Sequence, residues 1–290
     1  MTAALINPAG TVSGTVDATG CNIGVYYDHV GAGGTIKGAE ISGANYFGVL
    51  VNGDGGSVAV DVLASSIHDI GEFPLNGSQH GVAIYYRAFF LGGSATGKIS
   101  GNTLTNYQKG GIVVNGTGSN VVVSSNIVTG QGAVNYIAQN GIQFGYGSSG
   151  SAMKNTVTGH SYTGSSTASG GIIVVGGAGY GTCPDGGDCP YTSGIQIVQN
   201  IVKDNDIGVW LTNIDADGNP PADQTNVKVV NNAISSGAFT SGLYSAGIAD
   251  QGNNDKIINN SISGAGYSSP GIAIDADPSF TNRPKVHANK

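Results

Sequence analysis

The chain has 290 residues, of which 50 are glycine and only 10% are charged. Its formal net charge of −7 repels a phosphate backbone, which argues against nucleic acid as a partner. No apolar run is long enough to span a bilayer, so we expect no membrane insertion. No stretch changes composition enough to mark a linker, and we expect residues 1–290 to form a single domain.

One short pattern returns along the whole chain: glycine, valine or isoleucine, any residue, and then usually another apolar residue. Its first copy is Gly24-Val25-Tyr26-Tyr27, and the others begin at Gly48, Gly81, Gly111, Gly141, Gly171, Gly208, Gly247 and Gly271. Apolar residues that alternate with other residues in this way indicate a strand with one buried face. No window shows helical spacing of useful length. Each copy therefore predicts one strand of a repeating unit.

A second pattern lies between these copies and places an asparagine before a pair of alternating aliphatic residues. The asparagines are Asn102, Asn126, Asn155, Asn200, Asn232 and Asn260. Asparagine tolerates the left-handed backbone of a tight turn, and stacked carboxamides can hydrogen-bond to one another. We therefore expect an asparagine ladder. Ala39 and Ser65 occupy this position in earlier coils, so the ladder should fade toward the N-terminus.

Three short parallel strands per coil satisfy both patterns, and the predicted fold is all-β: a right-handed parallel β-helix of about nine coils with an asparagine ladder. The repeat resembles that of the pectate-lyase-like superfamily from about Thr11 to Asp277. The resemblance implies an exported protein that binds a polysaccharide and cleaves or epimerises it. Adhesins, phage spikes and fibre segments share this architecture, so a non-catalytic surface module remains the alternative.

Polar residues gather on the outward side of the first three coils and in the turn before the third. Adjacent coils should place matching positions one strand spacing apart, which makes these residues the candidate catalytic site: Asp28, His29, Asp54, His80, Tyr85 and Arg87. Carboxylates and imidazoles can act as general acids and bases, and an arginine can bind a substrate carboxylate. The alternative is an ordinary surface ion network. Asp28-His29 matches only part of the Asp-Pro-His-Asp motif of alginate epimerases.

A second candidate site is the segment Asn213-Ile214-Asp215-Ala216-Asp217-Gly218-Asn219. Oxygen-bearing side chains at alternate positions and a glycine at the sixth resemble the start of a calcium loop, although the distal glutamate of an EF-hand is absent. We expect Asn213, Asp215, Asp217 and Asn219 to bind Ca²⁺. The alternative is a turn rich in Asn and Asp.

Cys183 and Cys189 bracket the short loop CPDGGDC, for which we predict a local disulfide; a metal clip is the alternative. A disulfide implies an oxidising compartment, so we expect a secreted or cell-surface protein. Cys21 stands alone and is interpreted as a core or cap residue.

Four apolar residues occupy a nominally outward position of their coils, namely Leu50, Val113, Ile173 and Trp210. Such a row can mark a surface for stacking sugars or for a partner. We expect the long turns at 130–140, 159–170 and 236–246 to cover it. Asp275 and Asp277, in the last coil, are expected to form an end cap.

Overall fold

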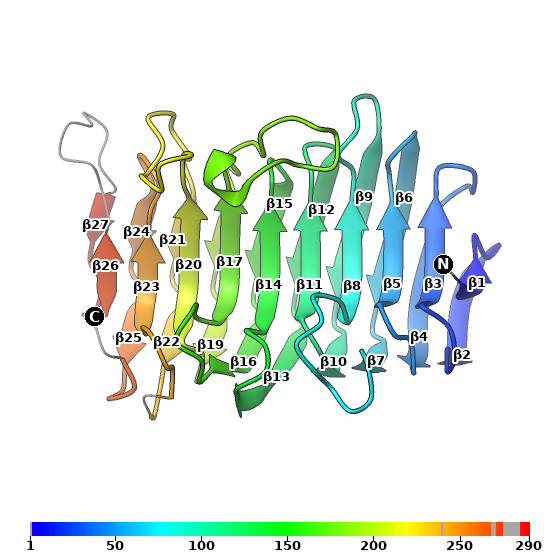
Figure 1. Cartoon of the computed structure of the whole chain (residues 1–290), viewed down its shortest axis with the longest axis horizontal. Helices are drawn as coiled ribbons and strands as arrows, with labels where there is room; N and C mark the ends of the chain where they lie inside the picture. Colours follow the sequence, from blue (N-terminus) through cyan, green and yellow to red (C-terminus); the bar gives the residue numbers. More distant parts are fainter. Residues whose placement is uncertain (1, 239, 268–270, 275–284) are drawn as a thin grey trace.

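The computed structural model describes residues 2–238, 240–267, 271–274 and 285–290, and these residues form a parallel β-helix (Figure 1). Ten parallel strands, one from each coil, make a sheet that we call sheet A. They are β1 (Ala3–Ile6), β3 (Ile23–Asp28), β5 (Phe47–Asn52), β8 (Val82–Arg87), β11 (Gly110–Asn115), β14 (Asn140–Gly145), β17 (Gly170–Gly176), β20 (Ile207–Asn213), β23 (Ala246–Asp250) and β26 (Ile272–Ile274). All nine copies of the glycine pattern lie at these strands, which confirms the predicted repeat. The strand β1 lacks the pattern and was not predicted.

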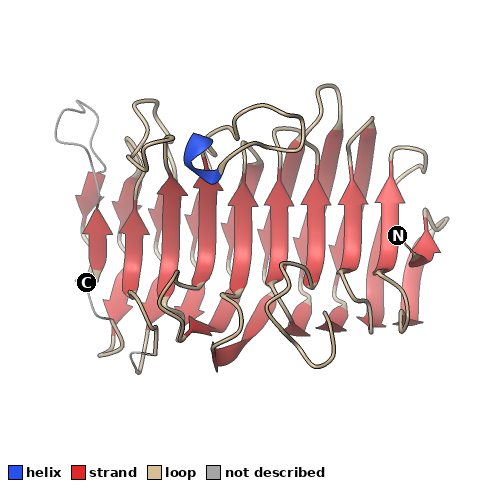
Figure 2. Ribbon diagram, viewed as in Figure 1, coloured by secondary structure: helices blue, strands red, loops and turns tan. Residues whose placement is uncertain are grey.

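Seventeen strands form a second sheet that supplies the other two sides of each coil. One series is β2 (Thr11–Asp17), β4 (Gly34–Ser42), β6 (Ser57–Leu63), β9 (Ser94–Ser100), β12 (Ser119–Ser124), β15 (Ser149–Met153), β18 (Gln196–Val198), β21 (Lys228–Val230), β24 (Lys256–Ile258) and β27 (Lys285–His287). The other is β7 (Ser66–Ile70), β10 (Thr103–Tyr107), β13 (Ile127–Val134), β16 (Thr156–Tyr162), β19 (Ile201–Lys203), β22 (Ala233–Ser235) and β25 (Ser261–Ser263). A short helical turn, η1 (Ala178–Tyr180), is the one helical element of the described residues and lies in a loop at the C-terminal edge of sheet A (Figure 2).

The repeated glycine of sheet A is required by the close approach of neighbouring coils. A Cβ atom on Gly48 would lie 2.6 Å from the carbonyl oxygen of Ala83, and one on Gly141 would lie 2.5 Å from that of Gly171. Real Cβ atoms do not come this close to a backbone oxygen, so any larger residue would push two coils apart. The aliphatic residue after each glycine then points inward, and one continuous apolar core fills the β-helix.

The asparagine ladder is present as predicted and extends one step further, to Asn289. The amide nitrogen of each asparagine donates to the side-chain oxygen of the next; the Asn126 Nδ2 to Asn155 Oδ1 distance is 2.9 Å. Each Nδ2 also donates to a backbone carbonyl, as Asn155 does to Val123 at 3.0 Å. Toward the N-terminus Asn102 meets Ser65 instead, so the ladder fades where expected. Asp275 and Asp277 lie outside the described residues.

Three further sequence features can be compared with the structure. Cys183 and Cys189 form the predicted disulfide, with their Cα atoms 4.9 Å apart. Cys21 is half-buried and packs against the core. Among the described residues no helix is long and apolar enough to cross a membrane.

Candidate functional site

The outward face of sheet A carries one continuous column of side chains, because the strands are in register from coil to coil. The column reads Tyr26, Leu50, Tyr85, Val113, Gln143, Ile173, Trp210, Ala249 and Ala273. A second outward column lies two residues further along each strand, toward the C-terminal edge of the sheet. Its first members are Asp28, Asn52, Arg87 and Asn115. The face is therefore polar and aromatic over the early coils and more apolar over the later ones.

Arg87 and Asp54 form an ion pair at the C-terminal edge of sheet A, with Arg87 Nη2 2.6 Å from Asp54 Oδ2. The other Asp54 oxygen accepts the backbone N–H of Phe89 at 2.7 Å, and the Arg87 guanidinium lies 5.4 Å from the centre of the Phe89 ring. The side chains are only 29% and 13% exposed, respectively. One guanidinium nitrogen is thus paired with Asp54, whereas the buried Nε of Arg87 has no hydrogen-bond partner.

Asp28 and His29 lie next to this pair but are held by different contacts. Asp28 Oδ1 accepts Asn7 Nδ2 at 2.7 Å and the N–H of Val30 at 3.0 Å. Burial alone would raise the pKa of Asp28, but these hydrogen bonds lower it below its ordinary value. The exposed His29 packs against the turn after Asp54, where a Cβ atom on Gly56 would lie 2.7 Å from the His29 Cβ. Asp28 is therefore an ionised turn residue.

Tyr85 lies between the two edges of the face and is half-buried. Its ring centre is 5.4 Å from that of Phe47. Burial raises the pKa of Tyr85, while the charge of Arg87 and a hydrogen bond with Asn115 oppose that rise. Asn115 in turn accepts Gln143 Nε2 at 3.1 Å, so the polar contacts continue onto the next coils.

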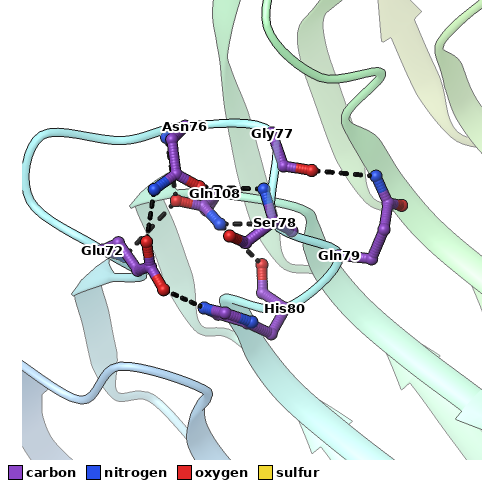
Figure 3. Close-up of polar contacts among 7 residues, drawn as sticks. All are labelled: Glu72, Asn76, Gly77, Ser78, Gln79, His80 and Gln108. Carbon is purple, nitrogen blue, oxygen red and sulfur yellow. Dashed lines mark hydrogen bonds and ion pairs between the residues drawn. The ribbon is translucent and has the colours of Figure 1, made fainter.

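His80 lies at the opposite end of β8 from Arg87, because it precedes the strand that Arg87 ends. Seven residues of extended chain span roughly 20 Å, so the six predicted residues do not converge on one point. The His80 Nε2 atom lies 3.1 Å from Glu72 Oε1 (Figure 3). The ring of Tyr46 meets the imidazole edge-on, with the ring centres 4.1 Å apart. His80 and Glu72 are 19% and 36% exposed, respectively.

The buried side chain of Gln108 fixes the loop that carries His80. Its Oε1 accepts the N–H of Asn76 at 3.0 Å and that of Glu72 at 3.3 Å, and its Nε2 donates to the carbonyl of Ser78 at 2.8 Å (Figure 3). Asn76 also donates to the Glu72 carboxylate. This loop, drawn in cyan below β8 in Figure 1, is therefore held at its centre by a residue of the next coil.

Two adjoining hollows lie over the later coils of sheet A. The first has a volume of about 340 Å³ and is lined by Lys109, Gln143, Tyr146, Tyr180 and Trp210, among others. The second, of about 480 Å³, continues toward the C-terminus over the small side chains of Ala249 and Ala273. Both volumes are typical of ligand sites. Trp210, Thr167 and Ala168 line both hollows, so the two form one groove along the sheet, which we call the sheet A groove.

The turns that we expected to cover the apolar row instead form one wall of the sheet A groove. Leu50, Val113 and Ile173 are buried, as expected, but Trp210 is half-buried and lies in the floor. Ala138, Ala168 and Tyr244 come from the turns at 130–140, 159–170 and 236–246. These turns belong to different coils and differ in length, and the sequence repeat gives no sign that they line a common groove.

Most polar groups that line the sheet A groove are uncharged and held by neighbours. Asp250 also lines it, but its carboxyl group is buried and accepts the N–H of Gly252 at 2.8 Å. Tyr180 hydrogen-bonds to Thr212, which also donates to Gln251 at 3.0 Å. The Nζ of Lys109 donates to the carbonyl of Ala138 at 2.9 Å. Burial lowers the pKa of Lys109. Lys109, Gln143, Tyr146 and Tyr180 were not identified from the sequence, because no motif connects them.

The predicted Ca²⁺ segment folds as a turn at the end of β20. Asp215 Oδ1 accepts the N–H groups of Asp217 and Asn219, at 2.9 and 2.8 Å. Asn213 is buried and uses both polar atoms of its carboxamide on the backbone of Thr192. Within the described ranges no three His, Cys, Asp or Glu side chains lie close enough to hold a metal ion. Ca²⁺ binding stays a prediction, tested by thermal unfolding with Ca²⁺ and with a chelator.

No protein-family model matches the chain, and no curated protein sequence matches it either. Among solved structures it is similar to the GH136 lacto-N-biosidase from Eubacterium ramulus (15% identity, TM-score 0.45, 92% of this chain). The chain spans only 50% of that enzyme. It is also similar to the A-module of a mannuronan C-5 epimerase from Azotobacter vinelandii (16% identity, TM-score 0.43, 97% of this chain and 89% of that one). A third is tailspike protein 3 of bacteriophage CBA120 (11% identity, TM-score 0.35, 95% of this chain and 51% of that one).

Proposed function

We propose that this protein is an exported carbohydrate-binding β-helix that holds a polysaccharide chain in the sheet A groove. The observation that carries the proposal is the position of Trp210, half-buried in the floor where the two hollows meet. An indole presents a flat apolar face on which a sugar ring can stack, and it retains a donor for a hydroxyl group. Tyr180, Gln143 and Thr212 surround it with groups that can hydrogen-bond to hydroxyls.

The shape of the sheet A groove supports an extended ligand. It runs along the stacking direction of the strands and spans several coils, from Lys109, just before β11, to Ala273 on β26. Parallel strands repeat about every 4.8 Å, so a groove over several strands offers several successive contacts. The disulfide between Cys183 and Cys189 supports the secreted or cell-surface location, because disulfides persist in oxidising compartments.

A second candidate function, catalysis, is favoured by the pair of His80 and Glu72. A carboxylate that accepts one imidazole nitrogen orients the ring and leaves the other nitrogen available as a general base. His80 follows Gln79, which lines the sheet A groove. In contrast, the described residues that line the groove include no pair of exposed carboxylates of the kind that most glycoside hydrolases use. Binding without cleavage is therefore our first candidate.

Affinity electrophoresis through gels that contain single polysaccharides tests the binding proposal. Wild-type protein should be retarded by at least one polymer, and Trp210→Ala should abolish the retardation. Val122→Ala, an exposed position on β12 in the other sheet, is the control and should migrate like the wild type. Free migration of folded wild-type protein in every gel would contradict the proposal.

The same polymers, assayed for new reducing ends and for unsaturated-uronate absorbance, test catalysis. Activity that is lost in His80→Gln while retardation in the gel persists would establish a catalytic His80. If activity survives His80→Gln but is lost in Asp54→Asn or Arg87→Met, the catalytic site lies at the C-terminal edge of sheet A.

A further inference from the structure

The charges around the sheet A groove indicate which class of polysaccharide it holds, an inference that rests on the proposed function. We infer that the ligand is an uncharged glycan and that the groove excludes polyuronates and other anionic chains.

The wall at the C-terminal edge of sheet A is acidic. The loops at 177–195 and 214–227, which follow β17 and β20, lie at this edge, and Tyr180 of the first loop lines the groove. Five aspartates lie in these loops and none is buried: Asp185, Asp188, Asp215, Asp217 and Asp223. Neither loop contains lysine or arginine. At physiological salt, charges act over about 8 Å, so a chain of carboxylates close to this wall is repelled.

The opposite wall has no ionised side chain to offset this repulsion. The segments 130–140, 159–170 and 236–246 contain no Asp, Glu, Lys or Arg. Their one titratable imidazole, His160, is fully buried, and its Nδ1 lies 2.7 Å from Asn205 Oδ1. Burial lowers the pKa of His160 to about 4, so the ring is neutral at physiological pH.

Among the described residues that line the groove, Lys109 is the one cation, and the buried Asp250 is the one carboxylic acid. The ammonium group of Lys109 already donates to Ala138, and burial weakens its charged form. One partly buried ammonium group does not balance five solvent-accessible aspartates. The remaining contact groups are the hydroxyls, carboxamides and aromatic rings that suit neutral sugars, whose recognition needs stacking and hydrogen bonds but no counter-charge.

Calorimetric titration with two matched sets of oligosaccharides tests the inference. The neutral set is oligomers of glucose, mannose, xylose and galactose, and the anionic set is oligomers of galacturonate and mannuronate of equal length. We expect measurable binding in the neutral set and at least tenfold weaker binding throughout the anionic set at 150 mM salt. We also expect the neutral affinity to change less than twofold between 50 and 500 mM salt.

Two variants test the contributions of the acidic wall and of Lys109 in the floor separately. Replacing Asp185, Asp188, Asp217 and Asp223 together by asparagine should leave neutral binding within twofold and strengthen the interaction with the anionic set. In Lys109→Gln, which changes a residue of the floor, the preference for the neutral set over the anionic set should persist. A uronate oligomer that binds wild-type protein more tightly than any neutral one, and loses affinity in Lys109→Gln, would overturn the inference but leave the proposed function intact. If neither set nor any polymer binds, the proposed function fails and the inference fails with it.

Discussion

Asp255 lies against Asp250 inside the β-helix, and the three preceding coils carry the apolar side chains of Phe144, Val174 and Leu211 at the position of Asp250. Asp250 is in register with Leu211 and Ile274, in the column that points into the core. Asp255 accepts hydrogen bonds from Thr225 Oγ1 and from the N–H of Val227, both at 2.7 Å. The other oxygen of each carboxyl group is buried and has no donor from any third residue. Two such groups in contact retain a proton between them.

This carboxyl pair predicts a loss of stability at alkaline pH. Burial raises the pKa of Asp255 to about 8 and that of Asp250 to about 6, above the ordinary aspartate value that applies in the unfolded chain. The native state therefore binds more protons than the unfolded state, and stability falls as the pH rises from about 4, where the unfolded aspartates ionise, to about 8, where the native pair has lost its protons. In Asp255→Asn the carboxamide keeps the acceptor for Thr225 and donates to Asp250. This variant should be more stable than the wild type at pH 8 and flatter in pH dependence, measured by urea unfolding. Asp217→Asn, at an exposed position, is the control; an equal change in both variants would contradict the assignment.

His160 predicts the opposite dependence on the acid side. Because burial lowers the pKa of His160 to about 4, the unfolded chain takes up a proton before the native one does. The stability that the neutral ring provides is complete above about pH 6.5 and is lost toward pH 4, by up to about 3 kcal/mol. His160→Gln should remove most of this loss of stability toward pH 4, measured by urea unfolding at pH 4, 5 and 7. His29→Gln, which changes an exposed imidazole, should lose stability toward pH 4 as the wild type does. If His160→Gln also loses stability toward pH 4 like the wild type, another group causes the loss.

The asparagine ladder predicts a large difference between buried and exposed asparagines. Asn155→Ala removes the acceptor for Asn126 and leaves buried backbone and side-chain groups unpaired, each at a cost of about 1–3 kcal/mol. We expect its free energy of unfolding to fall by at least about 2 kcal/mol. Asn120→Ala, at an exposed position on β12, should change it by less than about 0.5 kcal/mol. Equal losses in the two variants would mean that the ladder contributes little.

The ion pair of Arg87 and Asp54 predicts that substitutions of the two residues have non-additive effects on the free energy of unfolding. Arg87→Met leaves Asp54 partly buried without its counter-charge, whereas the double variant with Asp54→Asn removes both charges. We expect the single variant to lose about 1–2 kcal/mol and the double variant to recover part of that loss, as a double-mutant cycle measures. Additive losses would show that the two side chains do not interact energetically.

The strands and the ladder could be predicted because each depends on a pattern within a single coil. Gly48 is needed because the next coil lies close, and Asn155 because its carboxamide pairs with the asparagines of both neighbouring coils; each requirement recurs coil by coil and so appears as a repeat. The sequence also identified Asp54 and Arg87 as neighbours, because both belong to adjacent coils at the same edge. It did not separate His80 from Arg87, although the two residues bound opposite ends of one strand. The sheet A groove was missed for a different reason: loops of unequal length from separate coils build its walls, and no repeat encodes their meeting.

The central claim is that a glycan lies on Trp210, and the chain offers a direct test because this is its single tryptophan. The measurement is the collisional quenching of its fluorescence by acrylamide, with and without a polysaccharide that retards the protein in gels. A bound chain that stacks on the indole should shift the emission and reduce the quenching constant at least twofold. An emission spectrum and a quenching constant that stay unchanged at saturating polysaccharide would contradict the claim and place the ligand elsewhere on the protein.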